Sequence, residues 1–209
     1  MFAALLRRGR TPYIINFPNG SSSNGLKPQE DEISYNFVVA GGGANSAALD
    51  HDDGSSFYFN HHNVHVYGGH KSNFFGHNKK SITNLMLFPI VYQPQCMRIF
   101  PSLPVATSDA RWAEQFVNNT CILAGATDWY LDLGPDGCTP GAAIATQIVL
   151  ENNTVLVPPG SNASVRCGGA VLSYDEWMAT GSERGTTLGT VPPTAQIIAW
   201  ARALLGMGA

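Results

Sequence analysis

The chain has few charged side chains and no cluster of basic ones. Only 13% of its 209 residues are Asp, Glu, Lys or Arg, and the formal net charge is −3. A nucleic-acid-binding surface requires a basic patch or stripe, so we expect no nucleic-acid partner. Charged stretches that favour helices are also scarce, whereas Gly (22) and Pro (13) are plentiful. This composition predicts short strands joined by many turns, and not a helical bundle.

Long apolar runs are missing as well. No segment approaches the roughly 18 consecutive apolar residues of a membrane-spanning helix, so we expect no membrane span. The chain opens with the apolar residues 1–6, which are followed by Arg7, Arg8 and Arg10. A signal peptide has the opposite order, with its basic residues before an apolar run of about 7–15 residues. Residues 1–32 are therefore expected to be an irregular segment, and a truncated start is an open alternative.

Cysteine pairs with the spacing of a metal site are absent. The chain holds four cysteines and no CxxC pair: Cys96, Cys121, Cys138 and Cys167. Four sequons for N-glycosylation begin at Asn19, Asn118, Asn152 and Asn162. Together these features favour an oxidising compartment and a secreted glycoprotein with disulfides. The alternative is a cytosolic protein with four buried, unpaired thiols.

A short β-prone run led by asparagine recurs along the chain. The leading residues are Asn36, Asn63, Asn84, Asn119 and Asn153, at intervals of 27, 21, 35 and 34 residues. Such a repeat is typical of a parallel β-helix, in which every coil turns sharply at the same place. We expect Asn to adopt the left-handed conformation at this corner and its amide to hydrogen-bond the neighbouring coil. The competing β-sandwich needs strands about 8–12 residues apart with hairpin turns, which are largely absent.

The repeat predicts an all-β protein with a β-helix domain over residues 33–172. Around residues 96–150 the intervals lengthen, and long loops beside a repeat core usually shape one side of a groove. Disulfides Cys96–Cys121 and Cys138–Cys167 would each tie a loop to a coil, although four cysteines allow three pairings.

Residues 173–209 form a C-terminal extension of different character. Apolar residues recur at helical spacing over residues 194–205, with Thr194 as the N-cap and Gly206 as a stop. An open β-helix end would expose an apolar core and free strand edges, so we expect this helix to cap that end. A shorter helical turn is expected to begin near Tyr174.

The titratable residues are concentrated in one window, residues 50–77, which holds all six histidines. On a strand, Asp50 and Asp52 would share a face about 7 Å apart at the backbone. Paired carboxylates split their pKa values and serve as acid and base in glycosidases. The alternative for Asp53 is a simple Asx turn with Gly54. The string fails the EF-hand pattern, so Ca²⁺ bound by Asp50 and Asp52 lacks support and we expect no cofactor.

The histidines of the window differ in what they predict. His61, His62 and His65 surround a strand start, where hydrogen-bonded or exposed side chains are expected and no metal site. His70 and His77 each follow a glycine, where the backbone can approach a ligand. If adjacent coils overlie the aspartates, one of these two could reach them. Among the aromatic side chains near them, Tyr58 and Tyr67 suit stacking on sugar rings.

The run LDHDDGSSFYFNHHNVHVYGGHKSNFFGHNK resembles the DNDDGSSYY…NFFVYGGGGLKSDFGGH signature of right-handed β-helix domain proteins of algae and protists, whose activity is uncharacterised. The tail WMATGSERGTTLGTVPPTAQIIAWARALLGM is similar to their closing segment. The resemblance implies the pectin-lyase-like superfold, many of whose members bind or cleave polysaccharides. Asp52-Asp53 and Gly69-His70 are similar to motifs of its polygalacturonase-type glycosidases, at a shorter spacing. Lys71 is the basic candidate that a polysaccharide lyase of this fold would need.

We therefore expect a secreted, monomeric right-handed parallel β-helix that acts on a polysaccharide. The first hypothesis is a glycoside-hydrolase-like enzyme with Asp50 or Asp52 as base and Asp53 as acid, or the reverse. His70 and His77 would orient the substrate or tune a carboxylate, and Lys71 would bind it. The alternatives are a non-catalytic carbohydrate-binding or structural surface protein and, further, a polysaccharide lyase.

Overall fold

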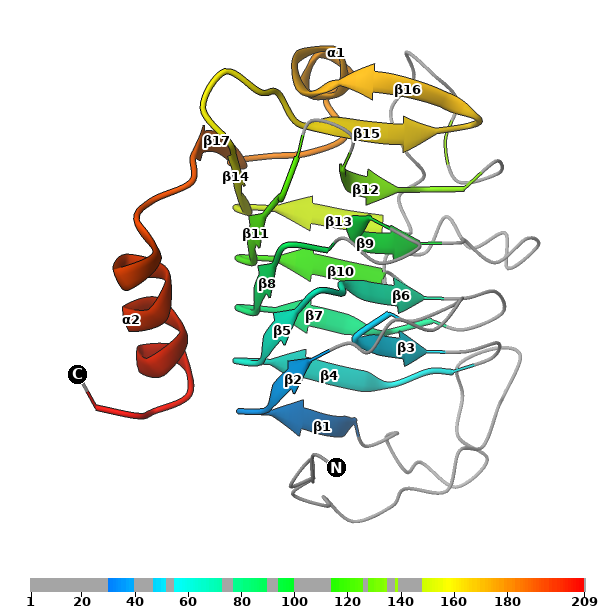
Figure 1. The fold of residues 1–209 in the computed structure, drawn as a ribbon. Coiled ribbons are helices and arrows are strands. Elements are labelled where there is room, and N and C mark those ends of the chain that lie inside the picture. Colours follow the sequence, from blue (N-terminus) through cyan, green and yellow to red (C-terminus); the bar gives the residue numbers. More distant parts are fainter. Residues whose placement is uncertain are drawn as a thin grey trace, which may run out of the picture.

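The computed structural model describes most of the chain from residue 30 onward. The described residues are 30–39, 47–51, 55–72, 77–89, 94–99, 114–125, 128–134, 138 and 148–208. They form three sheets of short strands that lie side by side along one long axis (Figure 1). Most of the two long loops expected between residues 94 and 143 lies outside the described residues.

The three sheets contain all of the strands that the structure describes. Sheet A consists of β1 (Asp31–Ser34), β4 (Tyr58–His61), β7 (Lys80–Ile82), β10 (Glu114–Val117) and β13 (Ile148–Glu151). Sheet B consists of β2 (Phe37–Val39), β5 (Val64–Val66), β8 (Leu85–Leu87), β11 (Thr120–Ile122), β14 (Thr154–Val157) and β17 (Thr187–Thr190). Sheet C consists of β3 (Leu49–His51), β6 (His70–Ser72), β9 (Gln95–Ile99), β12 (Trp129–Asp132), β15 (Ser164–Cys167) and β16 (Ala170–Ser173).

The chain visits sheets A, B and C in turn and repeats this circuit five times. We number the circuits as coils: coil 1 is β1–β3, coil 2 is β4–β6, coil 3 is β7–β9, coil 4 is β10–β12 and coil 5 is β13–β15. Every strand pairs in parallel with its counterpart in the next coil, and only β16 folds back antiparallel on β15. Parallel pairing is incompatible with the hairpins of the competing β-sandwich. The fold is therefore all-β with parallel sheets, which is consistent with the expected β-helix.

The five predicted asparagines form a continuous hydrogen-bonded ladder at the corner between sheets A and B. In each coil the asparagine donates its backbone N–H and its side-chain Nδ2–H to Oδ1 of the asparagine in the next coil. The N···O distances lie between 2.9 and 3.3 Å. Four of the five asparagines are fully buried, namely Asn63, Asn84, Asn119 and Asn153. The backbone N–H groups at this corner lie outside the hydrogen-bonded strands, and the asparagine side chains supply the acceptors that these buried groups need.

The left-handed residue at this corner is not the ladder asparagine, as the repeat predicted, but the residue before it. Positive φ values occur at Tyr35, His62, Thr83, Asn118 and Asn152, between 53° and 56°. The reason is the direction of the side chain: the left-handed residue turns the chain, and the next residue then points its amide inward. Asparagine is therefore selected at the ladder position for its amide and not for its backbone.

Glu183 closes the C-terminal end of the ladder. Nδ2 of Asn153 donates to Oε1 of Glu183 at 3.3 Å, and N of Asn153 donates to Oγ1 of Thr186 at 3.0 Å. The same carboxylate accepts hydrogen bonds from Tyr130 Oη at 2.5 Å and from Trp177 Nε1 at 2.7 Å. Burial, and then the charge of Glu183, raise the pKa of Tyr130 well above its usual value. Tyr130 therefore remains a donor to the carboxylate at neutral pH.

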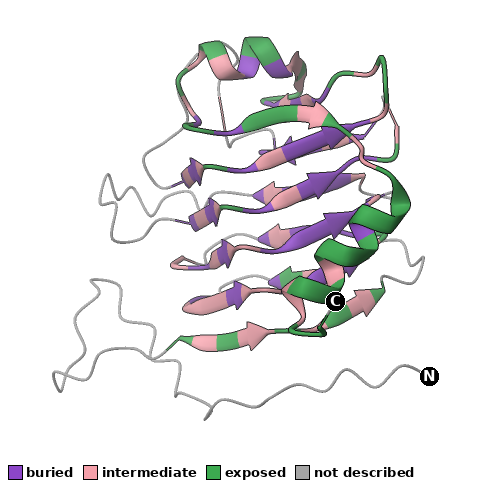
Figure 2. Cartoon of the chain, turned by 90° about the vertical axis from the view of Figure 1, so that its left-hand side faces the viewer, coloured by how far each residue is buried: buried purple, intermediate pink, exposed green. Residues whose placement is uncertain are grey.

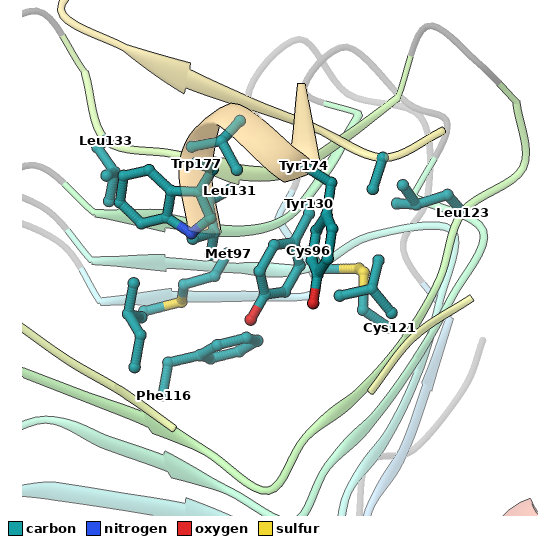
Figure 3. Close-up of a cluster of buried hydrophobic side chains, with 14 of the residues drawn as sticks. Cys96, Met97, Phe116, Cys121, Leu123, Tyr130, Leu131, Leu133, Tyr174 and Trp177 are labelled. Atoms are coloured by element: carbon teal, nitrogen blue, oxygen red, sulfur yellow. A yellow bond between two sulfur atoms is a disulfide. The ribbon is translucent and has the colours of Figure 1, made fainter. Parts of the chain in front are cut away.

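The interior of the C-terminal coils is a cluster of apolar side chains. Figure 3 shows Trp177 and Tyr174 of α1 (Tyr174–Ala179) reaching into the same cluster as Tyr130, Leu131 and Phe116. A capping box between Ser173 and Glu176 starts α1, as the helical turn predicted near Tyr174 requires. This short helix lies at the C-terminal end of the stack and closes its interior (Figure 1).

The two disulfides join the pairs of cysteines that the sequence analysis preferred. Cys96–Cys121 links β9 to β11 with the two Cα atoms 6.0 Å apart, and it lies inside the apolar cluster. Cys138–Cys167 links residue 138 to β15 with the Cα atoms 5.3 Å apart. Both bridges therefore tie neighbouring coils together.

The predicted C-terminal helix is present but does not cap the end of the stack. α2 (Thr194–Leu204) lies along the flank of the molecule, against the outer face of sheet B (Figure 2). Its Ile197, Ala201 and Leu204 pack on the outward side chains of β5, β8, β11 and β14. The predicted capping position is wrong because alternate residues of these strands, such as Leu85 and Leu87, are apolar and point outward. Helix α2 packs on these side chains and shields them from solvent. Residue Pro193, and not Thr194, occupies the N-cap position, and Gly206 ends the helix with a φ of 70°.

Candidate functional site

The two halves of the titratable window lie on adjacent strands of sheet C. β3 pairs with β6 so that Asp50 stands opposite Lys71, while Leu49 stands opposite His70. Lys71 Nζ donates to Oδ2 of Asp50 at 2.9 Å on the outer face. The next coil overlies Asp50, and the residue that reaches this aspartate is Lys71. His70 is one residue earlier and therefore points to the opposite face of the strand.

His70 lies inside the stack. It is 2% exposed, and its Nε2 is 3.0 Å from Nε2 of His65, which is also buried. Burial, followed by the proximity of His65 and His51, lowers the pKa of His70 well below its usual value. A substrate on the outer face cannot touch this ring, so the structure separates His70 from Asp50.

The close approach of the next coil explains why a glycine, Gly69, precedes His70. A Cβ at this position would lie 2.2 Å from the carbonyl oxygen of Cys96 and 2.3 Å from that of Gln95. The backbone at Gly69 therefore approaches the next coil, and not a ligand as the Gly-His pattern suggested.

The other predicted site residues are dispersed. His77 is half-buried, its Nδ1 lies 2.7 Å from Oδ1 of Asn78, and burial lowers its pKa. The ring of Tyr58 faces inward against His51, with 4.3 Å between centroids. Tyr67 is exposed at the turn after β5, with a φ of 65°. Asp52 and Asp53 lie outside the described residues. Of the predicted set, the described residues bring together only Asp50 and Lys71.

Asp50 and Lys71 belong to a longer row of charged side chains. The strand register continues from Lys71 to Arg98, from Arg98 to Asp132 and from Asp132 to Arg166. We call these five residues, Asp50, Lys71, Arg98, Asp132 and Arg166, the charged row. They occupy the same outward position in five successive coils, and neighbouring strands are about 4.8 Å apart. The row therefore spans about 19 Å along the outside of sheet C.

Two arginines share one buried carboxylate at the C-terminal end of the row. Asp132 has a side chain only 2% exposed, and its Oδ2 lies 3.3 Å from Arg98 Nε and 3.7 Å from Arg166 Nη1. Its Oδ1 accepts a hydrogen bond from the backbone N–H of Gly134 at 3.0 Å. Partial burial lowers the pKa of Arg98 and the nearby Asp132 raises it, and the group stays protonated at any physiological pH. One carboxylate between two guanidinium groups leaves one positive charge in excess.

An aromatic ring adjoins this arginine pair. The guanidinium carbon of Arg166 lies 5.1 Å from the ring centroid of Trp129, a cation–π arrangement. Trp129 is half-buried on β12, so part of its ring faces outward beside Arg166. Arg166 has 39% of its side chain exposed and Arg98 has 20%. The charged row therefore ends in an accessible group of two arginines and one tryptophan.

The carboxylates of the row are too far apart for paired acid and base catalysis. Asp50 and Asp132 are separated by three strand spacings, or about 14 Å at the backbone. Glycosidases hold their two carboxyl groups about 5 to 9.5 Å apart. Within the described residues, the outer face of sheet C thus presents charged side chains but no such pair.

Sequence reasoning missed Arg98, Asp132 and Arg166, although a signal exists. Counted from the ladder asparagine of each coil, the charged residue follows after 14 positions in coils 1 and 3, and after 13 positions in coils 4 and 5. Only in coil 2 is the interval shorter, with Lys71 eight positions after Asn63. Counting positions from each ladder asparagine could therefore have aligned the third strands of the coils and indicated the charged residues.

No group of three or more histidines, cysteines, aspartates or glutamates is placed to hold a metal ion among the described residues. Neither helix in the described part of the chain is long and apolar enough to cross a membrane. Comparisons of the chain with protein-family models, with curated proteins and with solved structures found no significant match.

Proposed function

We propose that this protein is an extracellular right-handed parallel β-helix that binds an anionic polysaccharide along the outer face of sheet C, without cleaving it. The observation that carries the proposal is the pair Arg98 and Arg166 on either side of the buried Asp132. The ligand class is a polymer with carboxylate or sulfate groups.

Charge supports an anionic ligand. The charged row carries three cationic and two anionic residues, and Asp50 is already paired with Lys71. The remaining carboxylate, Asp132, is buried, whereas both of its arginine partners reach the surface. The planar guanidinium group matches carboxylate and sulfate oxygens with two parallel hydrogen bonds.

The shape of the site supports a polymer. A row of about 19 Å with a regular spacing of about 4.8 Å is long and flat, whereas a small-molecule site is a concave pocket. Trp129 at one end offers a ring face for a sugar, as aromatic side chains do in many binding sites.

The described residues favour binding over hydrolysis or elimination. The two carboxylates of the row are too far apart to act as a pair, and His70 is inside the stack. Lys71, the candidate base of a lyase, is held by Asp50 in an ion pair. Asp52 and Asp53 are the residues on which a catalytic alternative would depend.

The covalent features support an extracellular location. Two disulfides cross-link adjacent coils, and such bonds persist in oxidising compartments. The sequon asparagines Asn118, Asn152 and Asn162 have exposed side chains, so attached glycans are compatible with the fold. Asn19 lies outside the described residues.

Affinity electrophoresis tests the proposal. The native protein is run through gels that contain polygalacturonate, a sulfated galactan or a neutral β-glucan. We expect retardation by one or both anionic polymers and none by the neutral one, with an effect that weakens as salt is added. Arg166→Gln should weaken binding roughly 10- to 150-fold, since a hydrogen bond between charged groups contributes about 1.5–3 kcal/mol.

Arg202→Gln is the matched control, because it removes the same charge from α2 on another face. Equal retardation of the Arg166 and Arg202 variants would contradict the proposed surface. Release of reducing ends from the polymers would show that the protein is a hydrolase, and release of unsaturated uronates would show that it is a lyase. In either case the variant Asp52→Asn would then show whether Asp52 takes part in the reaction.

A further inference from the structure

A pair of adjacent histidines faces one another on the surface of coil 2. His61 is the last residue of β4 and His62 is the corner residue that follows it. Consecutive residues of a strand normally point to opposite faces, but the φ of His62 is 53°. This left-handed conformation turns both rings to the same side, and their Nδ1 atoms are only 2.8 Å apart.

Neighbouring side chains hold each ring in place. Nε2 of His61 lies 2.9 Å from Oε1 of Glu32, and the same ring packs against Phe59 at a centroid distance of 4.2 Å. The ring of Tyr35 stacks on His62 at 5.2 Å with an interplanar angle of 23°. Tyr35 occupies the equivalent corner of coil 1, so the two rings are stacked by the coil repeat itself.

The partner of His61 decides which nitrogen carries its proton. Oε1 of Glu32 lies 2.9 Å from Nε2 of His61, and a glutamate carboxylate is ionised at neutral pH and can only accept a hydrogen bond. Nε2 of His61 is therefore protonated, and its Nδ1 presents a lone pair toward His62. A carboxylate on the far nitrogen is the usual arrangement behind a metal-binding histidine, where it fixes the tautomer and increases the basicity of the ligand.

We propose that His61 and His62 form a two-nitrogen chelating site for Cu²⁺ on the surface of coil 2, with Glu32 as the positioning carboxylate. With metal–nitrogen bonds of about 2.0–2.1 Å, two ligands at right angles have nitrogens about 2.9 Å apart, against about 3.3 Å for a tetrahedral pair. The hydrogen bond between the rings sets the observed separation of 2.8 Å, and it places both nitrogens within reach of adjacent coordination positions on one ion. Cu²⁺ also binds nitrogen ligands most tightly among the divalent first-row metals.

The stoichiometry of the site follows from its two ligands. Glu32 bonds the far nitrogen of His61, and the described part of the chain places no third histidine, cysteine or carboxylate so that it could hold a metal together with the two Nδ1 atoms, so solvent completes the coordination. Without metal, one Nδ1–H···Nδ1 hydrogen bond joins the rings. On binding, the proton on Nδ1 of His62 moves to its Nε2 through solvent, so both Nδ1 lone pairs bind the ion and no net proton is released.

Other coils supply matched variants for the test. The positions of His61 and His62 are occupied by Ile82 and Thr83 in coil 3, and by Val117 and Asn118 in coil 4. His61→Val and His62→Asn therefore install residues that the fold already accepts at these positions, including a residue that tolerates positive φ. His77→Asn removes a half-buried histidine from another corner and serves as the control.

The experiment is calorimetric titration of the untagged, full-length protein with CuCl2, followed by electron paramagnetic resonance. We expect one saturable Cu²⁺ per chain, a tetragonal spectrum with coupling to two nitrogens, and weaker binding of Zn²⁺. His61→Val and His62→Asn should each abolish the two-nitrogen spectrum, Glu32→Gln should weaken binding about tenfold, and His77→Asn should change neither. Circular dichroism confirms that each variant is folded.

Three outcomes would overturn the site: wild-type Cu²⁺ affinity in a folded His61→Val or His62→Asn variant, tighter binding of Zn²⁺ than of Cu²⁺, or no saturable binding. The site lies at the corner between sheets A and B, away from the charged row of sheet C, so it stands or falls independently of the proposed polysaccharide binding.

Discussion

Coil 2 and coils 4 and 5 share one backbone design but differ in what fills it. The inward positions of coil 2 are Asn60, His65 and His70. In coil 4 the same positions hold Phe116, Cys121 and Leu131, and in coil 5 they hold Leu150, Val155 and Val165. Coil 3 lies between them with Ser81, Met86 and Met97. The molecule thus passes from a polar interior to an apolar one along its axis.

The asparagine ladder and the strand pairing do not depend on whether the inward-facing side chains are polar or apolar. Both regions keep the same register, and Asn63 and Asn119 make equivalent hydrogen bonds in them. The polar layer is paired only in part: Asn60 Nδ2 is 2.9 Å from Nε2 of His51, and His65 pairs with His70, whereas the buried Oδ1 of Asn60 and Nδ1 of His65 have no hydrogen-bond partner in the described part of the chain. A polar interior of this kind is stable only while its members keep the protonation state that their bonds require.

Acidification should open the polar region and give the largest effect. Burial lowers the pKa of His51 and of His65 to about 4, from about 6.5 in the unfolded chain. Between pH 6.5 and 4 the unfolded state therefore binds protons that the folded state does not. The free energy of unfolding decreases as the pH is lowered through this range, by about 3 kcal/mol for each histidine. Glu114, buried beside Lys79, has its pKa raised from 4.5 to about 6 and offsets about 2 kcal/mol over the same range.

Urea unfolding at pH 7 and pH 4 measures this loss, and amide hydrogen exchange locates it. We expect protection to be lost first in coils 1 and 2. Exchange that begins in coil 5, or a stability that does not change between the two pH values, would contradict the role of the buried histidines.

Phe116→Ala should give the next largest effect, in the apolar region. Phe116 is completely buried, so the change removes apolar contacts and leaves a cavity that its neighbours cannot fill. We expect a loss of about 3–5 kcal/mol in the free energy of unfolding, measured in urea at pH 7. Ser81→Ala, at the equivalent position of coil 3, is the matched control and should change stability by no more than about 1 kcal/mol. Equal losses in both variants would erase the distinction between the two regions.

Removing a ladder asparagine should lower the free energy of unfolding by a similar amount in the polar and in the apolar region. Asn63→Ala and Asn119→Ala each remove an amide that accepts two hydrogen bonds and donates two more to buried groups. We expect each variant to lose about 2–3 kcal/mol, since a buried polar group left unpaired costs about 1–3 kcal/mol. The two values, from parallel urea titrations, should agree to within about 1 kcal/mol. A much smaller loss for Asn63→Ala would show that the ladder is weaker in the polar region.

Replacing the polar pair by methionines should have the smallest effect at neutral pH. The double change His65→Met and His70→Met copies Met86 and Met97 of coil 3. Removing both partners of a buried hydrogen bond is nearly neutral, so stability at pH 7 should change by less than about 1 kcal/mol. The part of the acid sensitivity due to these two histidines should disappear, as measured by urea unfolding at pH 4. His65→Met alone leaves His70 unpaired and should cost about 1–3 kcal/mol at pH 7.

Much of the scaffold could be predicted because its signals are local and repeated. The asparagine spacing located all five ladder residues, and the terminal helix and the residue that stops it were evident from helical spacing and Gly206. The preferred pairing of the four cysteines is the one that the structure contains, although the sequence left three pairings open. The candidate site was harder to predict, because alternation along a strand makes a single residue decide between interior and surface. Lys71 and His70 are adjacent in sequence, yet one joins the charged row and the other joins the core.

By itself, the sequence determined that the chain repeats, where each coil turns, and that titratable residues are gathered in the early coils. These properties depend on the conformational preferences of single residues and on spacing along the chain. Only the tertiary structure decided that Arg98, Asp132 and Arg166 meet, that α2 covers sheet B, and that His61 and His62 face one another. These contacts depend on the register between strands of different coils and on one positive φ, which no local pattern specifies. Five of the six histidines of the window therefore form two groups, a buried layer of His51, His65 and His70 and a surface pair of His61 and His62, separated by the direction in which each side chain leaves its coil.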